Sequence, residues 1–336
     1  MKRINTSGGG TGGHIYPAVA VAEALKRRLG DEVELLFVGA EGKMEMEKVP
    51  ALGYRIVGLP IAGLQRRLDW HNLAVPFKVL RSLRLARRTI RDFGADAVVG
   101  FGGYASAPVL WAAQRMGVPT VIQEQNSYAG VTNKILSRRA RCICTAYEGM
   151  ERFFPADRIV LTGNPLRGRF SKQGADRAEA LACYGFTPDL PVVLVVGGSL
   201  GTRSLNEMMK AWILRTEGKA PVQVIWQTGQ VLRAGDAGLP GGAPPWRMSG
   251  RGAFIDRMDY AYAAADVVVS RSGAGTVSEL CLVAPKVRWL SSPLARTSRG
   301  HRRDAGARGE GGSRGGVRCG VSRAGDGPCR GAPAGS

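Results

Sequence analysis

The sequence predicts an α/β fold with two successive parallel sheets, and three observations lead to it. From residue 1 to 287, short apolar runs bounded by Gly or Asn alternate with helical patterns, which is typical of βαβ units. Glycine-rich loops follow several of the apolar runs. The alternation stops after residue 287, where the composition changes abruptly. We therefore expect two α/β domains that face a cleft, the second of them incomplete.

The apolar runs place the predicted strands. In the first half they cover residues 2–6, 33–38, 96–101, 119–123, 141–145 and 158–161, and in the second half residues 191–196, 221–227, 252–255 and 266–270. The strand pattern restarts at Pro191 after a helical pattern over 176–184, so we expect a boundary between residues 163 and 168. The predicted domains are 1–163 and 164–287, followed by a tail over 288–336.

The composition is that of a globular protein, since 44% of the 336 residues are hydrophobic and 22% are charged. No stretch approaches the about 18 to 20 apolar residues that a membrane-spanning helix requires. The chain starts directly with a strand pattern instead of a signal peptide, so we expect it to stay in the cytoplasm. The cysteines lack zinc-site spacing, and we expect them to be reduced, with no metal or cofactor; they are Cys142, Cys144, Cys183, Cys281, Cys319 and Cys329.

Residues 288–336 differ in composition from the rest. They contain ten Arg and three acidic residues, a net charge of +7 within the +20 of the whole chain, together with twelve Gly and only four Val or Leu. Such a segment offers nothing from which to build a strand or a core. Three interpretations compete: a natural disordered tail, an RNA-binding Arg/Gly segment, and an out-of-frame translation of a GC-rich gene. The position favours the last, because the change falls inside the strand expected after Val283.

The first glycine-rich loop covers residues 7–14 (SGGGTGGH), between the first predicted strand and a helical pattern over 17–29. Bare backbone amides and a helix N-terminus at such a loop can approach a phosphate closely. The loop also fits G-x-G-x-x-G through Gly8, Gly10 and Gly13, so the alternative is a dinucleotide site with Glu41 as its acidic residue. His14 follows the last glycine directly, where its imidazole would face the ligand.

A second loop, residues 101–104 (FGGY), ends another strand of the first half. The strand ends of a parallel sheet open on the same side, so we expect both loops to share one ligand. A pyrophosphate is a suitable occupant, next to Gly10, Gly102, Gly103 and Tyr104. The simpler alternative is that each glycine pair only makes a tight turn between a strand and a helix.

The second half repeats this arrangement. Residues 197–201 (GGSLG) follow one predicted strand, and residues 271–279 (RSGAGTVSE) follow another and lead into a helix. Glu279 then lies in the first turn of that helix, where its carboxylate can accept hydrogen bonds from the two hydroxyls of a ribose. A nucleotide with its phosphates at the glycine loop fits, and this second set of loops disfavours a dinucleotide-dependent oxidoreductase.

Six motifs together resemble the MurG-type UDP-GlcNAc transferases of peptidoglycan synthesis. They are GGTGGH at 9–14, GGY at 102–104, QEQN at 123–126, GNPLR at 163–167, GGS at 197–199 and SGAGTVSE at 272–279. Their order and spacing match from residue 1 to about 286. The resemblance implies a GT-B architecture with two Rossmann-like domains, and metal-free, inverting transfer of GlcNAc to the 4-hydroxyl of undecaprenyl-pyrophosphoryl-MurNAc-pentapeptide.

The resemblance also implies a role for individual residues. The second domain would hold UDP-GlcNAc, with Ile255 beside the uracil and Glu279 on the ribose. The other implied nucleotide contacts are Arg167, Ser199, Ala274, Gly275, Thr276, Val277 and Ser278. Thr11, Gly12, Gly13 and Asn126 would line the cleft near the sugar, and the first domain would hold the lipid-linked acceptor, with its pyrophosphate at Gly10, Gly102, Gly103 and Tyr104.

The attacking hydroxyl must lose a proton, so the reaction needs a base within hydrogen-bond reach. His14 is the first candidate and Glu124 the second. The simpler role for His14 is a hydrogen bond to a neighbouring carbonyl at the start of the helix. The departing UDP would direct its charge to the helix N-terminus after Gly275, so that no cation is needed.

Residues 65–91 combine apolar and basic side chains. Leu73, Phe77, Leu80 and Arg84 fall on one helical face, after Gln65-Arg66-Arg67, and the basic residues Lys78, Arg81, Arg87, Arg88 and Arg91 lie nearby. This pattern suits contact with an anionic membrane surface. The alternative is an ordinary amphipathic helix packed on the sheet. We expect a peripheral protein on the cytoplasmic face of the bacterial plasma membrane, with a cell-wall synthesis or division complex as a possible partner and no nucleic-acid ligand.

The last 49 residues depart from the family pattern. The resemblance implies that the strand near residue 287 is followed by a Pro-rich turn and an acidic-His-Gln motif whose Gln contacts the sugar, and neither occurs here. We therefore expect this chain to bind UDP-GlcNAc poorly and to turn over little. The rival interpretations are another GT-B nucleotide-sugar transferase, a dinucleotide-binding oxidoreductase and a non-catalytic RNA-binding protein.

Overall fold

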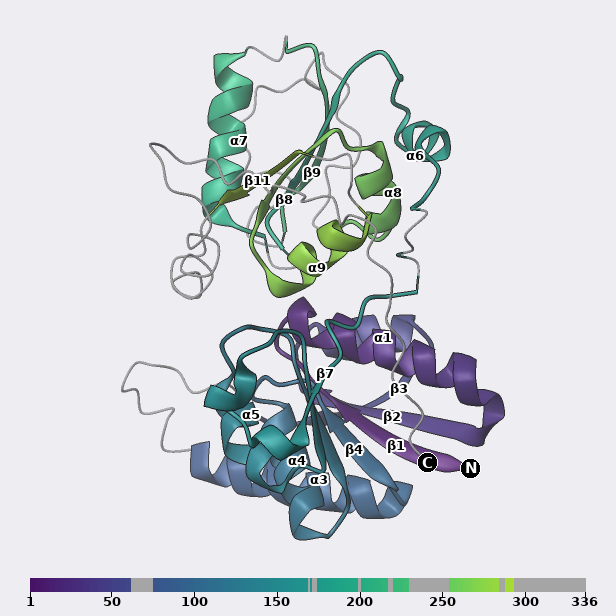
Figure 1. Cartoon of the computed structure of the whole chain (residues 1–336), viewed down its shortest axis with the longest axis vertical. Coiled ribbons are helices and arrows are strands. Elements are labelled where there is room, and N and C mark those ends of the chain that lie inside the picture. The colour runs from purple at the N-terminus through teal and green to yellow at the C-terminus, as the bar shows by residue number, and fades with distance from the viewer. Residues whose placement is uncertain are drawn as a thin grey trace, which may run out of the picture.

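The protein consists of two α/β domains, one above the other in Figure 1. The computed structural model describes residues 1–61, 75–168, 170, 174–198, 201–216, 220–229, 254–283 and 288–292. At residues 75, 76 and 288–292 it describes the backbone alone. An extended segment after residue 161 leads from the first domain to the second.

The first domain contains a seven-stranded sheet in the order β3-β2-β1-β4-β5-β6-β7, and every neighbouring pair is parallel. Its strands are β1 (Lys2–Ser7), β2 (Val33–Ala40), β3 (Arg55–Leu59), β4 (Ala97–Gly100), β5 (Thr120–Glu124), β6 (Cys142–Thr145) and β7 (Ile159–Leu161). Its helices are α1 (Gly12–Leu29), α2 (Glu45–Ala51), α3 (Val75–Phe93), α4 (Ser106–Arg115) and α5 (Val131–Leu136). The strand order changes direction between β1 and β4, which is where open parallel sheets bind ligands.

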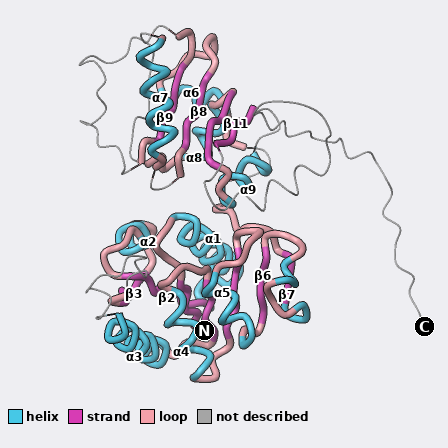
Figure 2. Tube along the Cα trace, turned by 90° about the vertical axis from the view of Figure 1, so that its left-hand side faces the viewer, coloured by secondary structure: helices cyan, strands magenta, loops and turns pink. Residues whose placement is uncertain are grey.

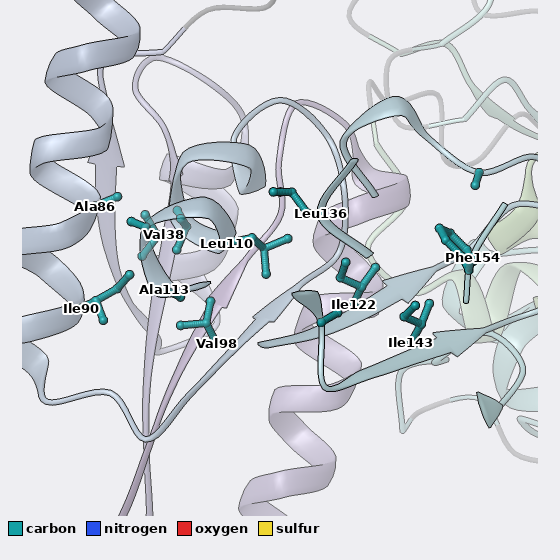
Figure 3. Close-up of a cluster of buried hydrophobic side chains, with 14 of the residues drawn as sticks. Val38, Ala86, Ile90, Val98, Leu110, Ala113, Ile122, Leu136, Ile143 and Phe154 are labelled. Atoms are coloured by element: carbon teal, nitrogen blue, oxygen red, sulfur yellow. The ribbon is translucent and has the colours of Figure 1, made fainter. Parts of the chain in front are cut away.

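Helices cover both faces of this sheet. Figure 2 shows α1 and α2 on one side, with α3 and α4 on the other. On the first side, Ile15, Val19 and Phe37 belong to one buried cluster. On the second side, the larger cluster drawn in Figure 3 includes Ile90 from α3 and Leu110 from α4. Because both faces are covered, β2 and β4 are nearly continuous apolar runs, as expected for a parallel sheet, whereas β1 (KRINTS) is largely polar.

The second domain has a smaller parallel sheet in the order β11-β10-β8-β9. Its strands are β8 (Val192–Val196), β9 (Gln223–Gln227), β10 (Val267–Arg271) and β11 (Arg288–Ser292), and its helices are α6 (Arg177–Tyr184), α7 (Arg203–Arg215), α8 (Met258–Ala264) and α9 (Ala274–Val283). The Asp176 side chain caps α6 by accepting a hydrogen bond from the Glu179 amide at 2.9 Å. Trp226 of β9 is fully buried, and its Nε1 donates to Asn206 Oδ1 at 3.1 Å.

Most of the predicted strands are confirmed, and three points differ. β3 was not predicted, because its five residues (RIVGL) mix a charged residue and a glycine with the apolar ones. The strand predicted over 252–255 is wrong for Phe254 and Ile255, which are in no strand. The expectation that residues 288–336 could build no strand is wrong for β11, which pairs with β10 at the sheet edge through backbone groups that any non-proline residue supplies.

Candidate active site

A cleft of about 420 Å³ lies between the two domains. The first domain contributes residues 11–14, Tyr16, Pro17, Gln125 and Asn126, and the connecting segment contributes 164–167. The second domain contributes residues 196–198, Gly201, Gln227, Phe254, Met258, Tyr262, Arg271, 273–276 and Glu279. These residues come largely from the carboxyl ends of strands and the helix starts that follow them, as expected for parallel sheets.

The structure brings many of the predicted site residues into this cleft. Thr11, Gly12, Gly13, His14, Asn126, Arg167, Ala274, Gly275, Thr276 and Glu279 line it. Among the residues that the structure describes, Gly10, Gly102, Gly103, Tyr104, Glu124, Ile255, Val277 and Ser278 do not. Ser199 lies outside the described residues. Ile255 is buried in the core of the second domain, so its backbone is the part that remains for a uracil contact.

His14 lies in the first turn of α1, on the first-domain wall of the cleft. Its Nδ1 is 3.2 Å from the Gly9 carbonyl oxygen and 3.1 Å from Thr11 Oγ1. A carbonyl oxygen can only accept, so the bond to Gly9 places the proton on Nδ1 and leaves the lone pair of a neutral ring on Nε2. Burial lowers the pKa of His14 below 6.5, although the Gly9 carbonyl and the carboxylates of Glu124 and Glu45 act in the opposite direction.

The loop at Gly102 and Gly103 packs against the His14 ring. Both glycines have positive φ, +86° and +78°. A Cβ at Gly102 would lie 3.4 Å from His14 Nε2, and a Cβ at Gly103 would lie 2.5 Å from the Gly9 carbonyl oxygen. These glycines therefore let two loops meet around the imidazole and leave the space beside Nε2 unfilled.

Glu124, the second predicted base, is fully engaged. One carboxylate oxygen accepts from the Asn126 backbone and side-chain nitrogens at 3.1 Å, and the other accepts from the Gly130 amide at 3.0 Å and from Asn133 Nδ2 at 2.9 Å. The side chain is buried and outside the cleft lining. The geometry suits a residue that holds Asn126 in place more than one that receives a proton from a substrate.

Glu45 of α2 contacts the first glycine loop, and this contact was not predicted. The Gly10 amide donates to both of its carboxylate oxygens at 3.2 Å. That amide is therefore not directed at a ligand, which limits the predicted role of Gly10 in holding a pyrophosphate.

On the opposite wall, Glu279 lies in the second turn of α9, so the prediction that it lies in the first turn is wrong. Its carboxylate accepts a hydrogen bond from the Tyr262 hydroxyl at 2.9 Å. Burial raises the pKa of Glu279 above 4.5, while the Tyr262 hydrogen bond and the charge of Arg167 lower it. The two guanidiniums on the cleft wall, those of Arg167 and Arg271, make this side of the cleft favourable for an anion.

Asn164 joins the two domains at the back of the cleft. Its Nδ2 donates to the Gln125 carbonyl of the first domain at 3.2 Å and to Ser278 Oγ of α9 at 2.9 Å. Ser278 in turn donates to the Ala274 carbonyl at 2.9 Å. Ser278 was predicted to contact the nucleotide, but in this structure its hydroxyl connects α9 to the segment between the domains.

Three polar atoms of the cleft-lining residues are buried and lack a hydrogen-bond partner within the described part of the chain: the Tyr16 hydroxyl, Arg167 Nε and Asn164 Oδ1. Buried polar groups are almost always paired, so these atoms are available to a polar ligand or to water in the cleft. Tyr16 also stacks on Phe254 at 5.9 Å and lies under the Arg167 guanidinium at 4.6 Å. Tyr16, Tyr262 and Arg271 were not predicted, because tyrosines and arginines carry no motif of their own.

The described side chains give no sign of a metal centre. No group of three or more His, Cys, Asp or Glu residues lies close enough to hold a metal ion in the ranges that the structure covers. Cys142, Cys144, Cys183 and Cys281 are free thiols, and burial raises the pKa of Cys144 to about 11. Cys319 and Cys329 lie outside the described residues.

The chain matches known proteins over most of its length. Residues 4–145 match the glycosyltransferase family 28 N-terminal domain, and residues 192–287 match the glycosyltransferase family 28 C-terminal domain. A protein of Parabacteroides distasonis is 52% identical over 295 residues, which cover 87% of this chain and 78% of the relative. A protein of Bacteroides fragilis is 49% identical over 293 residues, covering 87% and 76%. Both are named UDP-N-acetylglucosamine--N-acetylmuramyl-(pentapeptide) pyrophosphoryl-undecaprenol N-acetylglucosamine transferase.

Two solved structures share the arrangement of the domains. The crystal structure of Acinetobacter baumannii MurG superposes with a TM-score of 0.61 at 29% identity, covering 91% of this chain and 85% of that one. A UDP-GlcNAc 2-epimerase from Neisseria meningitidis, bound to UDP-GlcNAc, gives a TM-score of 0.60 at 15% identity, with coverage of 91% and 86%. At that identity the second likeness concerns the fold alone.

The fold and the cleft define a glycosyltransferase of the GT-B class, with a glycine-loop site in each domain. The sheet of the second domain is the smaller one, but the strands that reach the cleft are all present in it: the last residues of β8, β9 and β10 line the cavity. The chain belongs to the MurG family within glycosyltransferase family 28.

The packing around His14 predicts that Gly103→Ala destabilises the protein more than Gly117→Ala. Both glycines have similar positive φ, +78° and +75°, so each substitution carries a backbone cost of about 1–2 kcal/mol. A Cβ at Gly117 meets no described atom within 4 Å, whereas one at Gly103 overlaps the Gly9 carbonyl. We expect Gly103→Ala to lower the free energy of unfolding by about 1 kcal/mol more than Gly117→Ala does, as measured by urea unfolding. Equal losses in the two variants would contradict this account of the loop.

Proposed function

We propose that the chain transfers N-acetylglucosamine from UDP-GlcNAc to the MurNAc sugar of undecaprenyl-pyrophosphoryl-MurNAc-pentapeptide, the reaction that the names of its relatives describe. One observation carries the assignment to this cleft. The imidazole of His14 in the first domain and the guanidinium of Arg167 with the carboxylate of Glu279 line the same cleft between the domains. A base and an anion site in one cavity are what transfer of a sugar from a nucleotide requires.

The donor nucleotide fits the second-domain wall. The N-terminus of α9 and the guanidiniums of Arg167 and Arg271 would hold the pyrophosphate by charge and by hydrogen bonds. Glu279, one turn into the helix, would accept hydrogen bonds from the ribose hydroxyls. Tyr262 would keep that carboxylate oriented through its existing hydrogen bond. The unpartnered Tyr16 hydroxyl and Asn164 Oδ1 would face the polar parts of the sugar.

His14 would act as the general base. The acceptor hydroxyl attacks the anomeric carbon, its proton moves to His14 Nε2, and the bond from the anomeric carbon to UDP breaks with the electron pair leaving on the phosphate oxygen. The lowered pKa keeps the imidazole neutral at pH 7 and therefore able to take the proton. The charge that develops on UDP is stabilised by the helix terminus and the arginines. Attack on the face opposite UDP inverts the anomeric configuration.

Substitution of His14 tests this assignment. We expect His14→Ala to lower the turnover of radiolabelled UDP-GlcNAc by at least about 100-fold relative to the unsubstituted chain, because general-base catalysis is typically worth that much. Activity of the unsubstituted chain should fall in acid, since protonation of His14 removes the base, and the fall should come at a lower pH than for a histidine of ordinary pKa because burial lowers the pKa of His14. Glu41→Ala, at an exposed carboxylate, is the control and should keep its activity. A loss below about tenfold in His14→Ala would exclude His14 as the base.

The membrane-contact prediction gains support from the exposure of α3. Phe77 is 77% exposed and Leu80 is 45% exposed, and Trp111 of the neighbouring α4 is 37% exposed. The buried face of α3 consists of other residues, among them Ala86 and Ile90, so the explanation that the predicted stripe packs on the sheet is wrong for its described part. Leu73 and residues 65–67 lie outside the described residues. Within the described ranges, no helix has the length and apolar character needed to cross a bilayer.

The exposed apolar residues and arginines of α3 would bind the surface of an anionic membrane, where the lipid-linked acceptor resides. We expect simultaneous reversal of Arg81, Arg84 and Arg88 to Glu to abolish sedimentation with vesicles that contain phosphatidylglycerol, since each basic residue contributes about 1 kcal/mol near such a surface. Reversal of Arg203, Lys210 and Arg215 on α7 changes the net charge equally and should leave binding intact. Binding that survives the α3 reversal would exclude this surface.

The residues after Ser292 lie outside the described part of the chain. Their effect can be tested through the turnover of the chain and its affinity for UDP-GlcNAc. The glutamine motif that the family resemblance implies is missing from the sequence there. We therefore expect the 336-residue chain to form the disaccharide product more slowly than the relative from Parabacteroides distasonis, assayed in parallel with both substrates, and to bind UDP-GlcNAc more weakly in calorimetry. Equal turnover and affinity would show that the chain supplies the missing sugar contact by other residues.

A further inference from the structure

We propose that Glu45 is a positioning residue that fixes the tautomer of His14 through the Gly9–Gly10 peptide unit. Its catalytic meaning rests on the proposed role of His14 as the base, but the tautomer of His14 can be measured without any activity.

Glu45 occupies a space that the surrounding residues are shaped to leave for it. Its side chain is fully buried, and one carboxylate oxygen accepts from the Gly10 amide at 3.2 Å and from the Ala40 amide at 3.1 Å. A Cβ at Gly9 would lie 2.1 Å from that oxygen, and a Cβ at Gly39 would lie 2.6 Å from Glu45 Cγ. Glycine at both positions is therefore required for the carboxylate to fit.

The Gly9–Gly10 peptide connects this carboxylate to the imidazole. The N–H of the unit is that of Gly10 and donates to Glu45, and the carbonyl of the same unit is that of Gly9 and lies 3.2 Å from His14 Nδ1. A trans peptide is planar and rigid, and its N–H and C=O point in opposite directions. Fixing the N–H on Glu45 therefore fixes the carbonyl on His14, which requires a proton on Nδ1 and leaves Nε2 free to accept one.

The charge of Glu45 should add to its geometric effect. Among the described residues no cation lies within ion-pair distance of it, so its charge acts on the peptide in a medium of low dielectric. A carboxylate at the N–H end polarises the peptide and makes its carbonyl a stronger acceptor, which favours the protonated imidazole formed during the reaction. The other groups facing His14 are Thr11 and Glu124, and Tyr104 contacts the same loop near Gly10. Glu124 acts on the charge of His14 in the same direction as Glu45.

Nitrogen NMR of the full chain with labelled histidine tests the proposal. The sequence has three histidines, so the His14 signals can be assigned by their loss in His14→Gln. We expect neutral His14 to carry its proton on Nδ1. In Glu45→Gln, where one amide oxygen can still accept from Gly10 and Ala40, the tautomer should be kept and the pKa of His14 should fall. In Glu45→Ala the ring should populate both tautomers. Glu47→Gln, at an exposed carboxylate on the same helix, should change neither property.

Kinetics then separate positioning from folding. Glu45→Gln should lower kcat about ten- to hundred-fold with little change in the KM for UDP-GlcNAc, the range found for outer partners that orient a functional histidine, and its acid limb should move to lower pH. An Nε2-protonated His14 in the unsubstituted chain overturns the proposal, whether or not the variants fold. An unchanged pKa of His14 in a folded Glu45→Gln also overturns it. If these NMR results hold but His14→Ala retains turnover, the positioning role stands and the catalytic role of His14 falls.

Discussion

The parallel direction of the strands is the constraint on which the rest of the structure depends. All the carboxyl ends of a parallel sheet lie at one edge, so the loops that follow β1 and β4 must approach each other whatever their sequence. In this protein the two loops close around His14, and Gly102 and Gly103 of the second loop leave room for its ring because they have no side chain. The second domain repeats the arrangement at the ends of β8 and β10, and the cleft forms where the two edges face each other.

Buried charge is distributed differently on the two walls of the cleft. Behind the first-domain wall, Glu45 and Glu124 are enclosed by backbone and side-chain amides, and neither reaches the cavity. On the other wall, Arg167 and Arg271 lie at the surface of the cavity itself. The carboxylates behind His14 favour the protonated form of its imidazole, and the guanidiniums on the opposite wall favour an anion. In the proposed mechanism, both arrangements would stabilise the charges that develop as a sugar is transferred.

Among the described residues, the contacts between the domains combine hydrogen bonds and an ion pair with the stacking of Tyr16 on Phe254. Asn164 joins the end of β5 to α9, the Gly168 amide donates to Glu23 at 3.4 Å, and Lys48 lies 4.0 Å from Asp256. Interfaces between the domains of one chain normally permit relative movement of the domains. The bond from Asn164 to Ser278 couples the position of α9 to the connecting segment.

The sequence by itself determined the two parallel sheets and the glycine loops, because these features depend on local periodicity and on backbone conformations that glycine permits. Ten of the residues that line the cleft were named from the family resemblance. It did not identify β3, whose short mixed run has no periodicity of its own, or β11, whose pairing uses backbone groups alone. Only the tertiary structure decided the contacts of Glu45 and Glu124. Glu124 was named from the sequence as the second candidate base, but four donors from residues up to nine positions away surround its carboxylate. Glu45 lies 35 residues from Gly10, and no local pattern reports a contact that forms only when α2 packs beside the first loop.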